Sequence, residues 1–274
     1  MSAKSTCKQG PAHLHFRLRV ARIRPATHAL TQVRIIPQPE RKRNPMFLLT
    51  AATEFEMTPF LAVCRENSVP HLITGIGPVE TAVRLSAMLP GSAKAVRGVI
   101  NFGVAGAYVW PSARKTPQIL DICLAEREVL GDLGICLGER IEQIAANELR
   151  PPDVFRMDPG LLAAAGKALA DSRIPCFRGT FVTVSCASGT ARRGQMLARQ
   201  HGGLCENMEG AAVARVCQEF GLPCLELRCI SNLVEDRDTG RWQLQQACRK
   251  AGEATALVLT HLLAGTSSGS EARG

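Results

Sequence analysis

Two carboxylates stand close together in the segment Glu206-Asn207-Met208-Glu209, which precedes a run of small residues at 210–214. The run predicts a helix that begins near Glu209, where the helix dipole stabilises a carboxylate, so one interpretation of Glu209 is a simple terminal charge. The other is ligand binding, because an ionised carboxylate accepts two hydrogen bonds side by side, as the vicinal hydroxyls of a ribose require. The second acid and the methionine favour ligand binding.

Two stretches of small residues follow predicted strands. Residues 101–107 read Asn-Phe-Gly-Val-Ala-Gly-Ala, and ligands of open α/β sheets bind at the carboxyl ends of strands. Close packing of a helix on the sheet explains the same residues equally well. The shorter Gly75-Ile76-Gly77 has two glycines of a dinucleotide-binding turn, but Glu80 stands where the third is required, so we expect only a tight turn there.

An apolar segment at 224–230 ends in polar residues. Arg228 lies within this predicted strand, and a buried arginine needs an acidic partner. Ser231 and Asn232 follow directly, at the end of the strand where a ligand would meet them. The charged segment 235–238 is interpreted as a solvated surface loop.

The elements that position these residues alternate along the chain. Apolar runs predict strands at 47–52, 71–74, 96–104, 119–125, 180–185 and 224–230. Helical spacing predicts helices at 53–62, 79–89, 158–171, 190–201, 209–220 and 242–264. This alternation predicts an α/β fold, a three-layer single domain with a central mixed, mostly parallel sheet.

Composition and charge exclude several classes of protein. Of 274 residues, 46% are apolar, which excludes wholesale disorder. The apolar stretches are shorter than the about 20 residues that span a membrane, so we expect no membrane partner. The net charge of +9 arises within residues 1–45, which hold ten Lys or Arg and one acid, whereas residues 46–274 hold 23 residues of each sign. This neutral body, without basic clusters, predicts no nucleic-acid partner.

The chain divides into three parts by composition. Residues 1–45 are predicted to be a basic, disordered extension or the product of a start codon placed too early. Either is favoured over a targeting segment, although a transit peptide is also basic and poor in acids. Residues 46–265 are predicted to form the functional domain, and the small polar residues 266–274 a disordered tail. The 11 cysteines include no Cys-x-x-Cys pair, so we expect buried free thiols, a reducing cytoplasm and no metal site.

Six segments, taken in order, resemble the superfamily of purine nucleoside phosphorylases and nucleosidases over about residues 46–264. They are 52–56 (Ala-Thr-Glu-Phe-Glu), 75–79 (Gly-Ile-Gly-Pro-Val), 101–106 (Asn-Phe-Gly-Val-Ala-Gly), 183–190 (Thr-Val-Ser-Cys-Ala-Ser-Gly-Thr), 206–212 (Glu-Asn-Met-Glu-Gly-Ala-Ala) and 228–232 (Arg-Cys-Ile-Ser-Asn). Within it, the chain looks most like the futalosine hydrolases, a sister group of the methylthioadenosine/S-adenosylhomocysteine nucleosidases. The resemblance implies a nucleoside phosphorylase-like fold, no cofactor, a purine nucleoside as the small-molecule partner, and a homodimer or larger homo-oligomer.

The resemblance also implies roles at the sugar. It makes Glu56 the group that orients or deprotonates the attacking water. Met208 would pack against the ribose, and Glu209 would hold its 2′ and 3′ hydroxyls. Arg228 lies where the superfamily keeps an arginine on the strand beneath the site.

At the base, the resemblance implies a backbone contact at Gly106 and places Ser188 near the purine. Asn232 stands where the methylthioadenosine nucleosidases carry an aspartate. An amide donates a hydrogen bond but is no proton donor of tuned pKa, so we expect a 6-oxopurine such as hypoxanthine rather than adenine. Asp236 or Asp238 would supply an acid if the loop folded inward.

The predicted function is therefore hydrolysis of futalosine to hypoxanthine and dehypoxanthine futalosine, a step of menaquinone biosynthesis. The first loop, 50–58, has no cation and two glutamates, which favours water over phosphate as the nucleophile. The alternatives are a nucleosidase for methylthioadenosine, S-adenosylhomocysteine or aminofutalosine, a nucleoside phosphorylase, and a non-catalytic nucleoside-binding protein of the same fold.

Overall fold

The computed structural model describes residues 46–66, 69–91, 95–110, 116–138, 140–142, 144 and 151–267, and all of them belong to one compact unit. The predicted extension, 1–45, and residues 268–274 of the predicted tail lie outside the described residues. The division of the chain at 45 and 265 therefore stays a prediction, although the last helix continues to Ser267.

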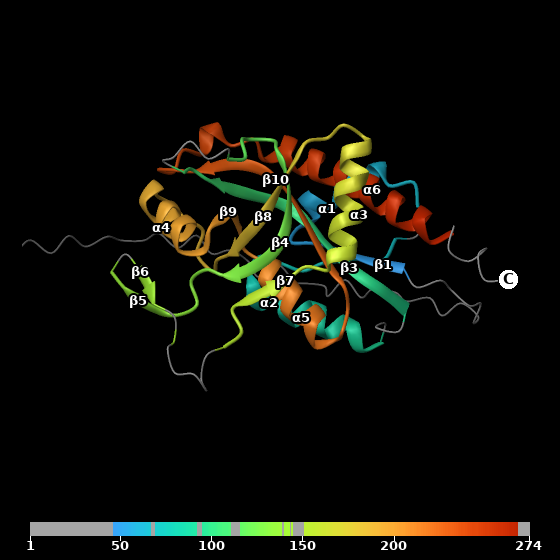
Figure 1. Ribbon diagram of the computed structural model, residues 1–274, viewed down its shortest axis with the longest axis horizontal. Helices are drawn as coiled ribbons and strands as arrows, with labels where there is room; N and C mark the ends of the chain where they lie inside the picture. Colours follow the sequence, from blue (N-terminus) through green and yellow to red (C-terminus); the bar gives the residue numbers. More distant parts are fainter. Residues whose placement is uncertain are drawn as a thin grey trace, which may run out of the picture. The chain divides into compact units, whose positions relative to one another are not determined.

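A mixed sheet forms the centre of the described part of the chain (Figure 1). Its strands are β1 (Met46–Ala51), β2 (His71–Ile73), β3 (Val96–Tyr108), β4 (Ile122–Leu130), β7 (Val154–Arg156), β8 (Cys176–Thr183), β9 (Gly203–Asn207) and β10 (Cys224–Val234). A separate two-stranded sheet pairs β5 (Ile135–Leu137) with β6 (Arg140–Glu142). Five strand pairs of the central sheet are parallel and three antiparallel, which agrees with the predicted mixed, mostly parallel sheet.

Five strands of this sheet close on themselves, a barrel-like arrangement that the predicted three-layer domain did not include. The order β10-β4-β8-β9-β3 is completed by pairing between β3 and β10. Closure depends on β9, a five-residue strand that the sequence pattern did not predict. It pairs in parallel with β8 and antiparallel with β3, where Gly106 lies opposite Glu206.

Within the described residues, six helices pack around the sheet. They are α1 (Glu54–Val63), α2 (Pro78–Met88), α3 (Pro159–Asp171), α4 (Ala191–His201), α5 (Gly210–Glu219) and α6 (Leu244–Ser267), with short 3-10 turns at Leu89–Gly91 and Thr239–Arg241. In Figure 1, α1, α3 and α6 cover one side of the sheet, and α2 and α5 lie together on the other. Alternate residues of β1 face these two sides, because successive side chains of a strand point in opposite directions. Phe47 and Leu49 join one apolar cluster and Leu48 the other.

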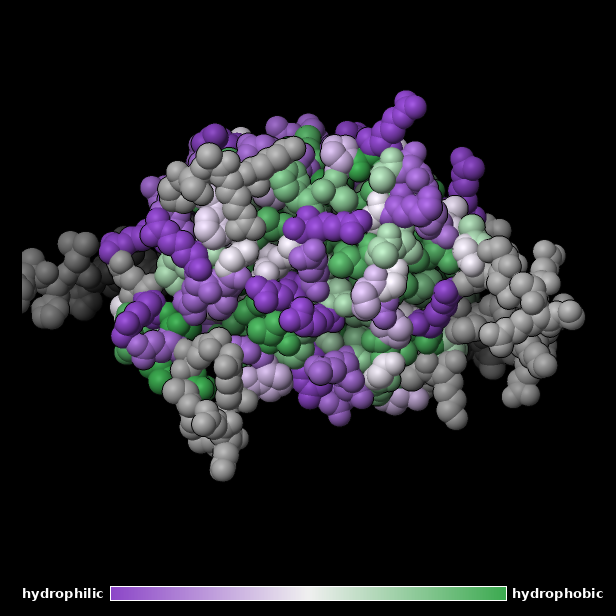
Figure 2. Space-filling view, in the orientation of Figure 1, coloured by the Kyte–Doolittle hydropathy of each residue, from purple (hydrophilic) through white to green (hydrophobic). Residues whose placement is uncertain are grey.

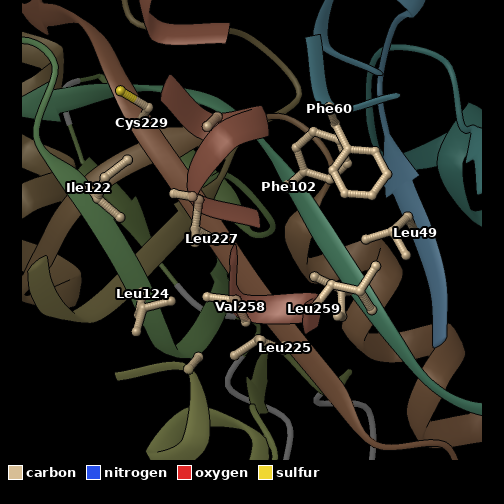
Figure 3. Close-up of a cluster of buried hydrophobic side chains, with 14 of the residues drawn as sticks. Leu49, Phe60, Phe102, Ile122, Leu124, Leu225, Leu227, Cys229, Val258 and Leu259 are labelled. Atoms are coloured by element: carbon tan, nitrogen blue, oxygen red, sulfur yellow. The ribbon is translucent and has the colours of Figure 1, made fainter. Parts of the chain in front are cut away.

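The larger apolar cluster anchors α1 to the sheet (Figure 3). Phe60 of α1 packs on Phe102 of β3 with ring centroids 5.2 Å apart, and Val258 and Leu259 of α6 belong to the same cluster. Because both phenylalanines are fully buried, α1 has little freedom to slide along β3. The first turn of α1 is therefore held beside residues 103–104 of β3.

The visible surface is mixed in hydropathy. Hydrophilic residues are spread over the face shown in Figure 2, with apolar residues between them. None of the described helices combines the length and the apolar character that crossing a membrane requires.

Candidate active site

A cavity of about 520 Å³ is lined by residues that directly follow β1 and β8, by the end of β9, and by residues within β3 and β10. Every one of the seven site residues predicted from the sequence lines it: Glu56, Gly106, Ser188, Met208, Glu209, Arg228 and Asn232. The structure therefore brings the predicted residues together; their roles remain proposals.

Glu56 is held in place by the beginning of its own helix. Thr53 caps α1, and the two residues form a reciprocal capping box. Glu56 Oε2 accepts hydrogen bonds from Thr53 N (3.1 Å) and Thr53 Oγ1 (2.9 Å), and Oε1 accepts one from Val104 N (3.1 Å). A carboxylate has about four acceptor positions, so one position, on Oε1, is left for a further donor such as water.

The surroundings of Glu56 suit a base. Its side chain is buried, and burial raises the pKa of its carboxyl; the positive charge of Arg228 lowers the pKa and the negative charge of Glu209 raises it. A raised carboxyl pKa makes the ionised form a better proton acceptor. Gly103 allows the approach, since a Cβ on Gly103 would stand 2.4 Å from Glu56 Oε1.

Glu209 is not the cap of its helix, although it stands at the N-cap position of α5. Asn207 caps the helix instead, because its Oδ1 accepts hydrogen bonds from Glu209 N (2.9 Å) and Gly210 N (2.7 Å). The Glu209 carboxylate instead accepts from Gly77 N (3.1 Å) and from Arg228 Nη1 (3.4 Å). The Glu209 carboxylate is therefore engaged by residues outside its own helix, and about two of its acceptor positions face no protein donor.

Arg228 lies within β10, is 1% exposed and has the acidic partners that the sequence predicts for it. Its Nε donates to Glu226 Oε1 (2.9 Å), and Nη1 donates to Glu209 Oε2 and to Val104 O (3.2 Å). Burial lowers the pKa of Arg228, but the charges of Glu226, Glu209 and Glu56 raise it by more, so the group stays cationic. The guanidinium thus acts on the cavity through the side chains that it holds.

The opposite end of the cavity contains Asn232, Ser188 and a residue that sequence reasoning did not assign, Glu206. Ser188 N and Oγ each donate to Glu206, both at 2.7 Å. Asn232 Oδ1 accepts from Ser231 Oγ (2.9 Å), and its Nδ2 donates to Leu233 O (3.2 Å), which leaves one N–H for a ligand. The sequence did contain a signal for a role of Glu206, because Glu206 belongs to the same short motif as Glu209.

Met208 and Gly106 also line the cavity. Phe55, Ile76 and Trp242 add apolar surface that was not predicted. The side chains of Phe55 and Ile76 are 50% and 62% exposed, so this apolar wall is open to solvent.

The charged loop after β10 does not place an acid in the cavity. Asp236 Oδ1 accepts from Ala191 N (3.1 Å) at the start of α4. Asp238 caps the 3-10 turn at Thr239–Arg241 and borders a small hollow of about 10 Å³ beside Asn232. Arg237 is the loop residue that lines the main cavity, and its guanidinium stacks over Trp242, 4.8 Å from the ring centroid.

Comparison with known proteins identifies the family. A protein-family model described as "Phosphorylase superfamily" matches residues 71–264 of this chain. The chain belongs to this superfamily. A futalosine hydrolase of Thermus thermophilus is 34% identical over 192 residues, which are 69% of this chain and 80% of that protein. One of Streptomyces coelicolor is 31% identical over 180 residues, 64% of this chain and 72% of that protein.

Other members of the superfamily agree with this assignment. A 5′-methylthioadenosine/S-adenosylhomocysteine nucleosidase of Shewanella halifaxensis is 29% identical over 193 residues, 69% of this chain and 78% of that protein. The solved structure of a futalosine hydrolase mutant of Helicobacter pylori has the same fold, with a TM-score of 0.67 at 21% identity over 79% of this chain and 99% of that one. The resemblance and the predicted enzyme class, an N-glycosidic hydrolase, are thereby confirmed.

Gly103→Ala tests the position of Glu56. The new Cβ would stand 2.4 Å from Glu56 Oε1 and 3.0 Å from Arg228 Nη1, so the carboxylate must move. A displacement of about 1 Å costs on the order of 10²-fold in turnover. We expect a loss of about that size in kcat for nucleoside hydrolysis, whereas the control Gly265→Ala, where no atom lies within 4 Å of the new Cβ, retains native turnover. Native kcat in the Gly103 variant contradicts the geometry.

Proposed function

We propose that the chain hydrolyses the N-glycosidic bond of futalosine, releasing hypoxanthine and dehypoxanthine futalosine. The observation that carries the proposal is the pairing of two buried carboxylates in one cavity, each with acceptor positions that face no protein donor. Glu56 keeps one such position and Glu209 about two. One water and a pair of vicinal hydroxyls match that pattern of acceptors.

The sugar binds at Glu209 in this proposal. Its 2′ and 3′ hydroxyls donate to the two carboxylate oxygens, while Met208 packs against the ring. Arg228 holds the Glu209 carboxylate in place through the 3.4 Å contact from Nη1. Arg228 then contributes to substrate binding through Glu209, because four of its five N–H donors are engaged by Glu209, Glu226, Val104 and Asn207.

Water attacks from the side of Glu56. As the glycosidic bond lengthens, positive charge develops on the ribose, and the ionised carboxylates of Glu56 and Glu209 stabilise that charge. Glu56 orients the water at Oε1 and accepts its proton as the bond to C1′ forms. The capping box with Thr53 holds the Glu56 carboxylate in place, so no second catalytic side chain is needed to orient it.

The leaving base is bound at the other end. The remaining N–H of Asn232 donates to N7 of the purine, where negative charge develops. Ser188 lies beside it with its own hydroxyl proton directed to Glu206 (2.7 Å), so the serine oxygen presents lone pairs. An acceptor at this position suits the N–H of a 6-oxopurine such as hypoxanthine.

Charge favours hydrolysis over phosphorolysis. Three of the residues that line the cavity are glutamates. The cation Arg228 is already paired with two carboxylates, those of Glu209 and Glu226. Arg237, at the rim, stacks on Trp242. A phosphate dianion needs several cationic donors at the sugar face, and the acids there repel it.

The choice of futalosine is supported by two relatives of that name at 34% and 31% identity. It is further supported by Asn232, an amide where the resemblance to the methylthioadenosine nucleosidases calls for an acid. The proposal places the reaction in menaquinone biosynthesis, and the cytoplasmic location and the homo-oligomer stay predictions within it.

The substrate is tested with the purified protein and three nucleosides. We expect rapid release of hypoxanthine from futalosine in the absence of phosphate. Methylthioadenosine should release adenine at a much lower kcat/KM, and inosine should release no more hypoxanthine when phosphate is added. Preferential cleavage of methylthioadenosine, or dependence on phosphate, contradicts the proposed substrate.

Glu56→Gln tests the proposed base. The isosteric amide does not accept a proton, so turnover should fall by about 10²–10⁴-fold, the usual contribution of a general base, with little change in substrate affinity. Glu54→Gln, an exposed change in the same helix turn, is the matched control and should behave as the native enzyme. In the native enzyme, kcat/KM should fall at acidic pH with a midpoint above that of an ordinary glutamate, because burial raises the pKa of Glu56. An acidic limb that persists in the Gln variant would assign the limb to another group.

Removal of residues 1–45 tests the boundary of the catalytic domain. The superfamily match and all seven proposed site residues lie beyond residue 45, so a chain that begins at Met46 should retain the native kcat and KM. Loss of activity in a folded truncated chain, with secondary structure checked by circular dichroism, contradicts the boundary.

A further inference from the structure

Two carboxyl groups that the proposed mechanism does not use meet behind the cavity. Glu128 of β4 and Glu226 of β10 are both 0% exposed. They face each other across Gly210: a Cβ on that glycine would stand 2.2 Å from Glu128 Oε1 and 2.4 Å from Glu226 Oε2. Only a residue without a side chain leaves room for two carboxyls at this point.

Three of the four oxygens have hydrogen-bond donors. Glu128 Oε1 accepts from Asn207 Nδ2 (2.6 Å) and Oε2 from Thr183 Oγ1 (2.8 Å). Glu226 Oε1 accepts from Asn101 Nδ2 (3.1 Å) and from Arg228 Nε (2.9 Å). Glu226 Oε2 is buried with no such donor, although it faces Glu128, and a buried acceptor without a donor is costly.

We propose that Glu128 keeps its proton and donates it to Glu226 Oε2, and that this pair, carrying one negative charge, positions Arg228 and through it Glu209. Both residues are then positioning residues. Their role at the ribose rests on the proposed function, whereas the shared proton does not.

The charges around Glu128 and Glu226 favour one shared proton between the two carboxyl groups. Arg228 already compensates Glu226 and Glu209 and lies close enough to Glu56 to lower the pKa of its carboxyl. A fourth ionised carboxylate would leave one guanidinium among four negative charges in a dry interior. Burial raises the pKa of Glu128 well above its usual range, and the charge and the hydrogen bond of Glu226 raise it further, whereas hydrogen bonds from Thr183 and Asn207 lower it.

The geometry distinguishes the two acids. Glu128 Oε1 must accept from Asn207 Nδ2 and also donate to Glu226, which a carboxylic acid hydroxyl can do and an amide cannot. The amide of Asn207 is unable to reverse, because its oxygen accepts from Glu209 N and Gly210 N. In Glu128→Gln, the amide nitrogen can take the place of Oε1, where it faces another donor, Asn207 Nδ2. In the reversed orientation the amide oxygen lies there instead, and Glu226 Oε2 has no donor.

The same change at Glu226 is milder. In Glu226→Gln, the carbonyl oxygen still accepts from Asn101 and Arg228, and the amide nitrogen takes the place of Oε2. It then donates to Glu128, which loses its proton and keeps the single negative charge in the pair. The two isosteric substitutions should therefore have unequal effects.

The proton is tested without substrate by infrared spectroscopy in D₂O at neutral pH. Native protein carrying ¹³C-labelled glutamate should show the isotope-shifted carbonyl stretch of a buried protonated carboxyl. The stretch should vanish in both Glu128→Gln and Glu226→Gln and persist in Glu219→Gln, an exposed change. A native protein without the stretch, or a stretch that survives in both variants, overturns the shared proton even if futalosine is cleaved.

The positioning role is tested by kinetics. Glu128→Gln should raise KM for the nucleoside about tenfold or more above the KM of Glu226→Gln, with smaller differences in kcat, because a misplaced Glu209 weakens ribose binding. Equal KM values in the two variants overturn the positioning role. If neither variant folds, a labelled native protein without the stretch still overturns the shared proton. If the native protein shows the stretch but no nucleoside is cleaved, the proposed function fails and the shared proton stands.

Discussion

The burial of Arg228 is the constraint on which the rest of the site depends. A guanidinium with 1% exposure is tolerated only with charged partners, because breaking a buried ion pair costs about 3–5 kcal/mol. Glu226 supplies one partner from the same strand, and Glu209 supplies the other from the start of α5. The ion pair that keeps the arginine in the sheet therefore also fixes the carboxylate that is proposed to meet the ribose.

The closed ring of strands makes this arrangement possible. Pairing of β3 with both β9 and β10 places Gly106 opposite Glu206 on one side and opposite Asn232 on the other. The bulge in β10 between Ile230 and Asn232 re-aims the strand at the point where it borders the cavity. Glu56 reaches the same cavity from helix α1, which is held on the sheet by the apolar packing of Phe60.

Local sequence was enough to predict most elements and seven of the residues that line the cavity, because ordered short motifs and apolar runs are local signals. It was not enough to predict closure, since the pairing of β3 with β10 joins segments more than 100 residues apart in the chain. The strand β9 was missed because it is short and its Glu206 and Asn207 have the polar character of a loop, although both are buried. The pairing of Glu128 with Glu226 depends on the same closure and has no signal in either strand alone.

The most direct test of the account is a crystal structure of the Glu56→Gln variant with bound futalosine. The account predicts that the 2′ and 3′ hydroxyls both donate to the Glu209 carboxylate, that Arg228 contacts Glu209 and not the nucleoside, and that a water lies between Gln at position 56 and C1′. A ribose whose hydroxyls are bound away from Glu209, with the Arg228–Glu209 contact broken, would contradict it.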